Sequence, residues 1–170
     1  MGCDIHILTE YKSKDNNPNW PNSWHALNWS PVNPGRNYDL FNKLSGVRGY
    51  NDNPIATAGW PDGQISMAAS YASRSRIVND LKPDERREGC VSPETAEQWV
   101  KYGSRIIKDN DGNATHVTNP DWHSYGHCTI KQMSEALRKN SNPEYRAMMA
   151  AARSLEKDGM EVRFLFFYDN

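Results

Sequence analysis

The apolar run near the end of the chain constrains the fold more than any other feature. Residues 162 to 168 read Val-Arg-Phe-Leu-Phe-Phe-Tyr, so apolar side chains fall on both alternating faces of an extended segment. A strand of this kind buries both faces, and we expect it at the centre of a sheet. The rest of the chain must then supply flanking strands and the helices that cover them.

A second strand is expected over residues 3 to 10, where the side chains alternate. One face would carry Cys3, Ile5, Ile7 and Thr9. The opposite face would begin with Asp4 and His6, two positions apart and therefore on the same side. Because sheets often join the first and last strands of a domain, we expect this strand beside the last one, with Asp4 and His6 close to Asp169.

Helix and turn signals fill the chain between these two strands. The expected helices cover residues 38 to 46 (capped by Asn37), 67 to 81, 93 to 102, 130 to 137 and 143 to 158. A hairpin is expected where residues 105 to 108 and 114 to 117 flank an Asn- and Asp-rich turn. Residues 11 to 36 and 49 to 66 are expected to be long functional loops. This order predicts an α+β fold, with helices packed on a mainly antiparallel sheet that includes both terminal strands.

Length and composition narrow the class of protein. The 170 residues predict a single domain, residues 1 to 170. The formal net charge is −1, so a protein that coats duplex DNA through its phosphates is not expected. No apolar run reaches the roughly 18 residues of a membrane-spanning helix, and no membrane association is expected. Three cysteines without a C-x-x-C pair predict reduced thiols in a cytoplasmic protein.

The first candidate for a functional site is the pair Asp4 and His6. A carboxylate and an imidazole side by side on a strand suit metal binding or acid–base catalysis. A hydrogen-bonded polar pair at a sheet edge explains the same two residues equally well.

The second stretch is residues 122 to 129, expected to be a loop that leads into a helix capped at Thr129. Backbone N–H groups at a helix start attract anions, and His123 and Ser124 can add donors. Alternatively, His123 and His127 can hold a metal ion, or the loop can simply pack its aromatic side chains.

The third stretch contains Arg48 and Trp60. An arginine can bind a phosphate through paired hydrogen bonds, and a tryptophan can stack on a base. Arg48 and Trp60 are therefore candidates for a nucleotide site. A structural stack explains them equally well. Pro61-Asp62-Gly63, which follows Trp60, is first of all a turn.

Several segments resemble a family of small proteins encoded by bacteriophages and prophages. The chain opens Met1-Gly2-Cys3-Asp4-Ile5-His6, as that family does. Further segments are similar to the family's sequence and keep its order: Tyr38-Asp39-Leu40-Phe41, Val47-Arg48, Pro54-Ile55, Gly59-Trp60-Pro61-Asp62, His123-Ser124, Thr129-Ile130, Val162-Arg163-Phe164 and Phe167-Tyr168-Asp169-Asn170.

The chain departs from the family pattern at three positions. Ala58 stands where the family has Arg, Tyr125 where it has a second His, and His127 where it has Trp. These departures bear on a shared mechanism more than on a shared fold. The resemblance implies a phage protein that acts in the host bacterial cytoplasm against host defences, many of which signal through cyclic nucleotides or modified ADP-ribose.

The preferred hypothesis is a protein that binds and sequesters such a nucleotide-derived immune signal, of the cyclic nucleotide or cyclic ADP-ribose type. The side chains expected to hold phosphate are Arg48, His123, Ser124 and a neighbouring His6. Those expected to contact base or ribose are Trp60, Tyr125, Asp4 and Asp62. Binding of this kind requires no cofactor.

Two alternatives stay open. One is a phosphoesterase that cleaves such a nucleotide, with a divalent metal ion held by Asp4, His6, His123, His127 and Asp169. The other is a protein–protein inhibitor of a host enzyme that uses the Trp-rich segment 20 to 29. The sequence leaves open whether the chain is an enzyme and whether it forms a homo-oligomer.

Overall fold

The computed structural model describes residues 2–15, 19, 22–49, 51–61, 64–82, 89–138 and 142–169. Contacts group the chain into two compact units, Met1–Ala69 together with His123–Asn170, and Ser70–Trp122. Each unit is built on its own sheet. Within the described ranges, no helix is long and apolar enough to cross a bilayer.

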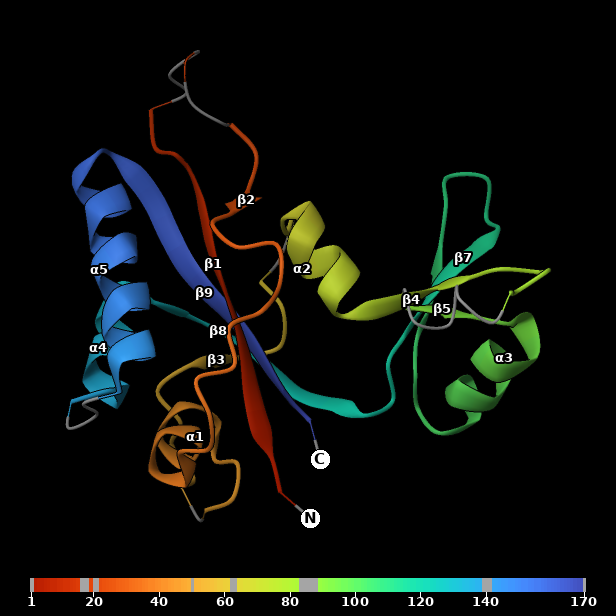
Figure 1. The fold of residues 1–170 in the computed structure, drawn as a ribbon, viewed down its shortest axis with the longest axis horizontal. Coiled ribbons are helices and arrows are strands. Elements are labelled where there is room, and N and C mark those ends of the chain that lie inside the picture. The colour runs from red at the N-terminus through yellow and green to blue at the C-terminus, as the bar shows by residue number, and fades with distance from the viewer. Residues whose placement is uncertain are drawn as a thin grey trace. The chain divides into compact units, whose positions relative to one another are not determined.

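The first unit contains a five-stranded sheet in which the first and last strands lie side by side (Figure 1). Its strands, in the order β2-β1-β9-β8-β3, are β1 (Asp4–Ser13), β2 (His25–Ala26), β3 (Thr57–Ala58), β8 (Trp122–Thr129) and β9 (Met160–Asp169). β1 and β9 pair antiparallel from Asp4 opposite Asp169 to Ser13 opposite Met160. The expected α+β fold is confirmed, and β9 is the central strand as its apolar pattern predicts.

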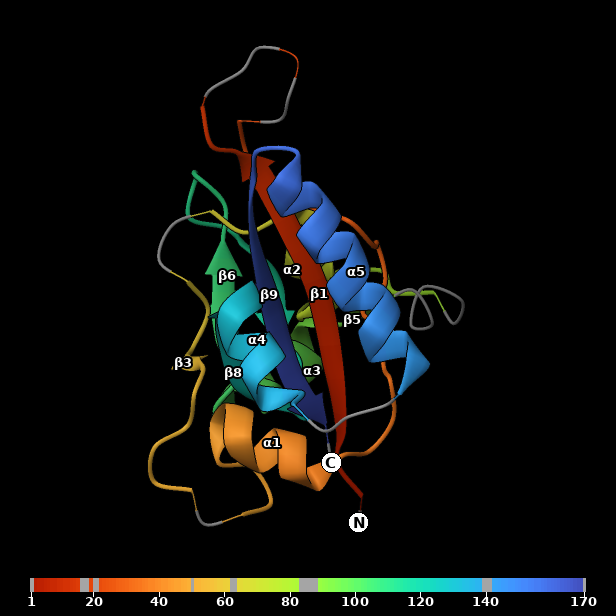
Figure 2. The ribbon, with the colours of Figure 1, turned by 90° about the vertical axis from the view of Figure 1, so that its left-hand side faces the viewer.

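Three helices pack on one face of this sheet. They are α1 (Tyr38–Ser45), α4 (Ile130–Ala136) and α5 (Pro143–Lys157), and Figure 2 shows α4 and α5 lying over β9 and β1. The buried core between the helices and the sheet includes Ile5, Ile7, Leu40, Phe41, Met133, Tyr145, Met149, Phe164, Phe166 and Tyr168. The helix-facing side of β1 and β9 is therefore mainly apolar, whereas the opposite side carries polar residues such as His6 and Glu10 beside buried Leu8, Leu165 and Phe167.

Local capping residues start each of these helices where the sequence predicts. The Asn37 side chain accepts a hydrogen bond from the Leu40 backbone N–H at 3.0 Å. Thr129 and Gln132 form a capping box at α4, and Asn142 caps α5 ahead of Pro143. These contacts satisfy N–H groups that a helix start otherwise leaves unpaired.

The side of the sheet opposite these helices contains a buried ion pair that no local pattern indicates. Glu10 and Arg163 are register partners on β1 and β9, and the fully buried Glu10 carboxylate accepts from the Arg163 guanidinium at 2.7 Å. The other Glu10 oxygen accepts from the Ser66 backbone N–H at 2.6 Å. The Trp24 ring lies over the same guanidinium, which is 3.6 Å from the ring centroid.

The second unit contains a four-stranded sheet of order β5-β4-β7-β6. Its strands are β4 (Arg74–Ile77), β5 (Cys90–Val91), β6 (Ile106–Lys108) and β7 (Ala114–Thr118). α3 (Pro93–Lys101) packs on one face and buries Val91, Ala96 and Val117. The expected helix after Ser92 and the expected β6–β7 hairpin are both confirmed.

Four segments differ from expectation, and one is the expected loop 49–66, which contains the short strand β3 paired with β8. The helix predicted over residues 67 to 81 is wrong in its second half, because α2 (Met67–Ala72) ends early and the following residues pair with β7 as β4. Residues 122 to 129 form β8 rather than a loop, because β9 and β3 supply partners on both sides. In the expected loop 11–36, β2 and Val32 both pair with β1.

Candidate functional site

The polar end of the candidate site lies where β1 begins and β9 ends. Asp169 accepts hydrogen bonds from the Asp4 backbone N–H at 3.0 Å and from His6 Nε2 at 2.9 Å. The Asp4 carboxylate pairs with the Arg36 guanidinium at 2.9 Å. The structure therefore brings Asp4 and His6 to Asp169, as strand pairing predicts, and adds a cation.

A chain of rings extends from this polar end along the same face of the sheet. His6 stacks on Phe167, its register partner, with centroids 5.2 Å apart and 10° between the ring planes. Phe167 contacts Tyr125 at 5.6 Å and Trp60 at 6.2 Å, and the Trp60 and Tyr125 centroids are 5.1 Å apart. We call these four side chains the ring cluster. It places three predicted site residues around one buried phenylalanine.

A backbone irregularity at Ser124 separates Tyr125 from His123. Ser124 has a φ of 49°, in the left-handed region that non-glycine residues seldom adopt. Tyr125 contacts Phe167, whereas His123 stacks on Tyr168 with centroids 6.0 Å apart. Phe167 and Tyr168 are consecutive on a regular strand and point to opposite faces. Tyr125 and His123 therefore also point to opposite faces, although a regular strand would place them on one.

The predicted phosphate-holding residues are divided between the two faces. Arg48 lies within hydrogen-bonding reach of the Cys3 thiol on the helix-covered side, where burial raises the pKa of that thiol despite the arginine. His123 lies on that side as well, while His6 belongs to the opposite one. The predicted group of Arg48, His123 and His6 is therefore not formed, because His6 lies on the other face of the sheet from Arg48 and His123.

The five side chains predicted as metal ligands do not gather either. Asp4, His6 and Asp169 are adjacent, but His123 faces the other way and His127 Nδ1 donates to the Gly59 carbonyl at 2.9 Å. Across the described ranges, no group of three His, Cys, Asp or Glu side chains is arranged to hold a metal ion. The start of α4, expected to attract an anion, is occupied by its own capping box.

Two buried polar atoms border the Ser124 irregularity. Tyr125 Oη and His123 Nε2 have no hydrogen-bond partner within the part of the chain that the structure describes. A buried polar group without a partner costs about 1–3 kcal/mol, so such atoms mark places where water or a ligand completes the bonding. Burial raises the pKa of Tyr125 to about 12, so its phenol stays a neutral hydrogen-bond donor at pH 7.

Ser124 and His123 also form a hydroxyl–imidazole pair, with Oγ and Nδ1 2.9 Å apart. A catalytic pair of this type needs a third group that orients the imidazole through its other nitrogen. His123 Nε2 lacks such a partner among the residues described. The pair can therefore donate hydrogen bonds, but it is not assembled as a nucleophile and base.

The remaining predicted residues are Asp62 and the tryptophans of segment 20 to 29. Asp62 and Trp20 lie outside the described residues. In the Trp-rich segment 20 to 29, Trp24 packs on Arg163, whereas Trp29 is 73% exposed.

Sequence reasoning missed Phe167 and Arg36. Phe167 shares its alternating face with Asp169, and that parity was the available signal. Arg36 offered no signal, because it reaches Asp4 across 32 positions from a segment without periodicity. A Cβ at Gly2 would overlap the Arg36 guanidinium, so a larger residue there would require the end of the arginine side chain to shift.

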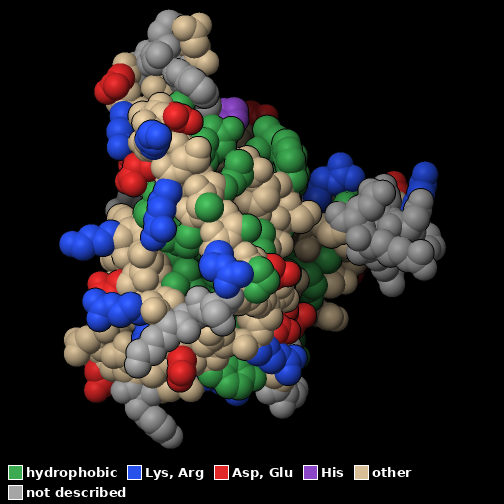
Figure 3. Space-filling view, turned by 60° about the vertical axis from the view of Figure 1, so that its left-hand side comes forward, with side chains coloured by type: hydrophobic (Ala, Val, Ile, Leu, Met, Phe, Trp, Pro, Cys, Tyr) green, Lys and Arg blue, Asp and Glu red, His purple; other side chains and the backbone are tan. Residues whose placement is uncertain are grey.

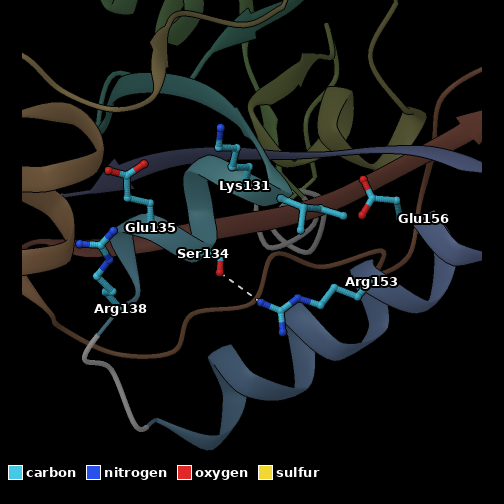
Figure 4. A pocket seen from close by; sticks show the side chains of 7 residues that line it. Lys131, Ser134, Glu135, Arg138, Arg153 and Glu156 are labelled. Atoms are coloured by element: carbon cyan, nitrogen blue, oxygen red, sulfur yellow. Dashed lines mark hydrogen bonds between the residues drawn. The ribbon is translucent and has the colours of Figure 1, made fainter.

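A separate groove of about 490 Å³ lies between α4 and α5 (Figure 4). It is lined by Ile130, Lys131, Ser134, Glu135, Arg138, Arg153 and Glu156. Figure 4 shows Lys131 and Arg138 pointing in different directions, while Arg153 donates to Ser134 Oγ at 3.1 Å. Figure 3 shows basic and acidic side chains mixed over this face. These cations do not converge on one anion, and the groove contains none of the predicted site residues.

We expect the His6–Asp169 contact to make stability sensitive to acid. Burial alone would raise the pKa of Asp169, but hydrogen bonds from His6 and the Asp4 N–H outweigh it and lower the pKa below its usual range. A lowered folded-state pKa contributes stability that is present above the unfolded-state pKa of about 3.9 and is lost as pH falls through the folded value. The urea midpoint of the wild type should therefore exceed that of Asp169→Asn at pH 6, and the difference should shrink below about pH 4.

The control for this titration is Asp158→Asn, at an exposed carboxylate that follows α5. Its midpoint should run parallel to that of the wild type over the same pH range. If the Asp169→Asn difference were independent of pH, the hydrogen bond from His6 would not stabilise the carboxylate.

Comparison of the chain with protein-family models, curated proteins and solved structures gave no match.

Proposed function

We propose that the protein binds a small phosphate-bearing nucleotide on the face formed by the ring cluster and the Asp4, Arg36 and Asp169 side chains. It would hold this ligand unchanged and so sequester a host immune signal, the role suggested by the resemblance to phage proteins. The observation that carries the proposal is the continuity of rings and charges on one face. His6 joins the rings to the charged groups, because it stacks on Phe167 and forms a hydrogen bond with Asp169.

The two halves of this face match the two halves of a nucleotide. Trp60 and Tyr125 offer ring surfaces on which a base can stack. Arg36, whose side chain is 56% exposed, and His6 offer donors to a phosphate. The buried Tyr125 hydroxyl needs an acceptor, which a base or ribose can provide. Arg36 replaces Arg48 and His123 in this proposal, since those two lie on the other face.

The arrangement favours binding over bond cleavage. His6 is oriented by Asp169, as a catalytic imidazole would be. The exposed Ser124 hydroxyl pairs with His123, whose Nε2 has no orienting partner among the described residues, so this pair is not assembled for nucleophilic catalysis. The orientation of His6 favours one enzymatic alternative. This is a metal-independent phosphoesterase in which His6 acts as general acid or base.

The test incubates the purified protein with cyclic dinucleotides, cyclic ADP-ribose isomers and linear nucleotides. The filtrate is analysed by HPLC before and after the protein is denatured by heat. A ligand that is depleted before heating and recovered intact afterwards supports sequestration. Conversion to a new product supports the phosphoesterase instead, and no depletion of any nucleotide overturns both.

For a nucleotide that is retained, we expect Trp60→Ala to raise the Kd about tenfold or more, since stacking on an aromatic ring contributes about 1–3 kcal/mol per base. The matched control is Trp29→Ala, at an exposed tryptophan outside the ring cluster. Titration calorimetry measures both. If Trp60→Ala bound as tightly as Trp29→Ala, the ring cluster would not be the base-binding surface.

A further inference from the structure

The second unit carries a basic cluster on the face of its sheet away from α3. Arg74 and Arg76 are two positions apart on β4 and share a face, and His116 on β7 is the register partner of Arg76. The intervening pair, Ser75 and Val117, is buried on the opposite face, where α3 packs. Three groups able to carry positive charge therefore project from adjacent strands in one direction.

Among the described residues, these groups lie together without an acidic counterpart. Arg74 is partly buried, and its Nε donates to the neutral Ser70 carbonyl at 2.8 Å. Within residues 70–82 and 89–122, no acidic side chain forms an ion pair with Arg74 or Arg76. Burial, then repulsion from Arg74 and Arg76, lowers the pKa of His116. Like charges held together in this way are stabilised by a bound anion.

An exposed aromatic ring adjoins this cluster. Tyr71, at the end of α2, meets His116 edge-on with ring centroids 6.5 Å apart, and it is 61% exposed. A large exposed ring beside clustered cations is the combination that proteins use to bind single-stranded nucleic acid, where the base stacks and the phosphate pairs. The cluster thus has a partner for each part of a nucleotide unit.

We propose that Arg74, Arg76, His116 and Tyr71 form a second site, which takes a nucleotide phosphate either within a single strand or as a free nucleotide. Arg76, the exposed arginine, contacts the phosphate, and Tyr71 stacks on the adjoining base. Arg74 and His116 line the site and raise its potential. This site is independent of the proposed function, because all four residues belong to the other compact unit.

The experiment uses fluorescence anisotropy with the full chain and a labelled oligothymidylate of about ten nucleotides, at several salt concentrations. We expect Arg76→Gln to weaken binding about fivefold or more and to reduce the slope of log K against log salt by about 0.7. Tyr71→Ala should weaken binding about tenfold. Competition with unlabelled thymidine monophosphate separates the two sources of the phosphate: equal affinity per site indicates a free nucleotide, and much weaker competition indicates a strand.

Each variant has a matched control in the same unit. Lys101→Gln removes an exposed cation of α3, and Tyr102→Ala removes a tyrosine that is 84% exposed at the end of α3. Both should bind as the wild type does. Trp60→Ala, in the other unit, should also leave this binding unchanged, which separates failure of this proposal from failure of the proposed function.

A second readout follows His116 by NMR during addition of inorganic phosphate. Among the described residues, the charged or titratable groups that act on its ring are Arg74 and Arg76 on β4 and Tyr71 on α2. A bound phosphate should shift its ring resonances and raise its apparent pKa. The proposal is overturned if the oligonucleotide and the phosphate both fail to bind at low salt, or if the control variants lose as much affinity as Arg76→Gln and Tyr71→Ala.

Discussion

Glu10→Ala should lower the free energy of unfolding by about 3–5 kcal/mol, as measured by urea denaturation of the full chain. The substitution leaves Arg163 in place, with a side chain only 12% exposed, and removes the carboxylate that compensates its charge. The Ser66 backbone N–H loses its acceptor as well. Breaking a buried pair by removing one partner is costly for this reason, since the remaining charge stays desolvated.

The same two strands provide the control. Lys12 and Glu161 form the next cross-strand pair on that face, at 3.1 Å, but their side chains are 31% and 50% exposed. Glu161→Ala should therefore cost only about 0–1 kcal/mol. The double variant Glu10→Leu/Arg163→Met should recover most of the loss, because apolar groups carry no desolvation penalty. Equal losses for Glu10→Ala and Glu161→Ala would contradict the role of burial.

Gly126→Ala should lower the free energy of unfolding by about 1–3 kcal/mol. Gly126 lies on β8 where a Cβ would stand 2.6 Å from the ring of Phe166, a core residue of β9, and 3.3 Å from the Thr57 carbonyl. Neither atom belongs to a flexible side-chain end, so the backbone or the core must shift. Overpacking of a close-packed core carries a cost of this size.

The double variant Gly126→Ala/Phe166→Leu tests the contact directly. A smaller side chain at 166 makes room for the added methyl group, so the two substitutions should cost less together than the sum of their separate costs. Thermal and urea unfolding of all four proteins complete the cycle, with an expected coupling of about 0.5–3 kcal/mol. Strict additivity would mean that the glycine is not required by the Phe166 ring.

The candidate site was predictable to the extent that it depends on strand parity. Alternation places Asp4 and His6 on one face of β1, and pairing of the terminal strands brings them to Asp169. Parity gave no guidance at residues 122 to 129, which were expected to be a loop. In β8 the left-handed backbone of Ser124 sends His123 and Tyr125 to opposite faces. A serine carries no sequence signal for that conformation. The placement of His123 and His6 on opposite faces of the sheet could therefore not be predicted from the sequence.

The sequence by itself determined the features that depend on neighbouring residues. These are the caps at Asn37, Ser92, Thr129 and Asn142, the β6–β7 turn, and the central position of the doubly apolar β9. Each rests on side-chain chemistry or periodicity within a few positions, where local energetics decide the conformation.

Only the tertiary structure decided which distant groups meet. Four features join segments that are far apart in the chain. They are the contact of Arg36 with Asp4, the burial of Glu10 against Arg163, the strand at 122–129, and the pairing of Arg76 with His116. Their partners depend on which strands lie side by side and in which register, and a shift of one residue would turn every side chain to the other face. That choice is made by the packing of the whole core, which no local window of sequence contains.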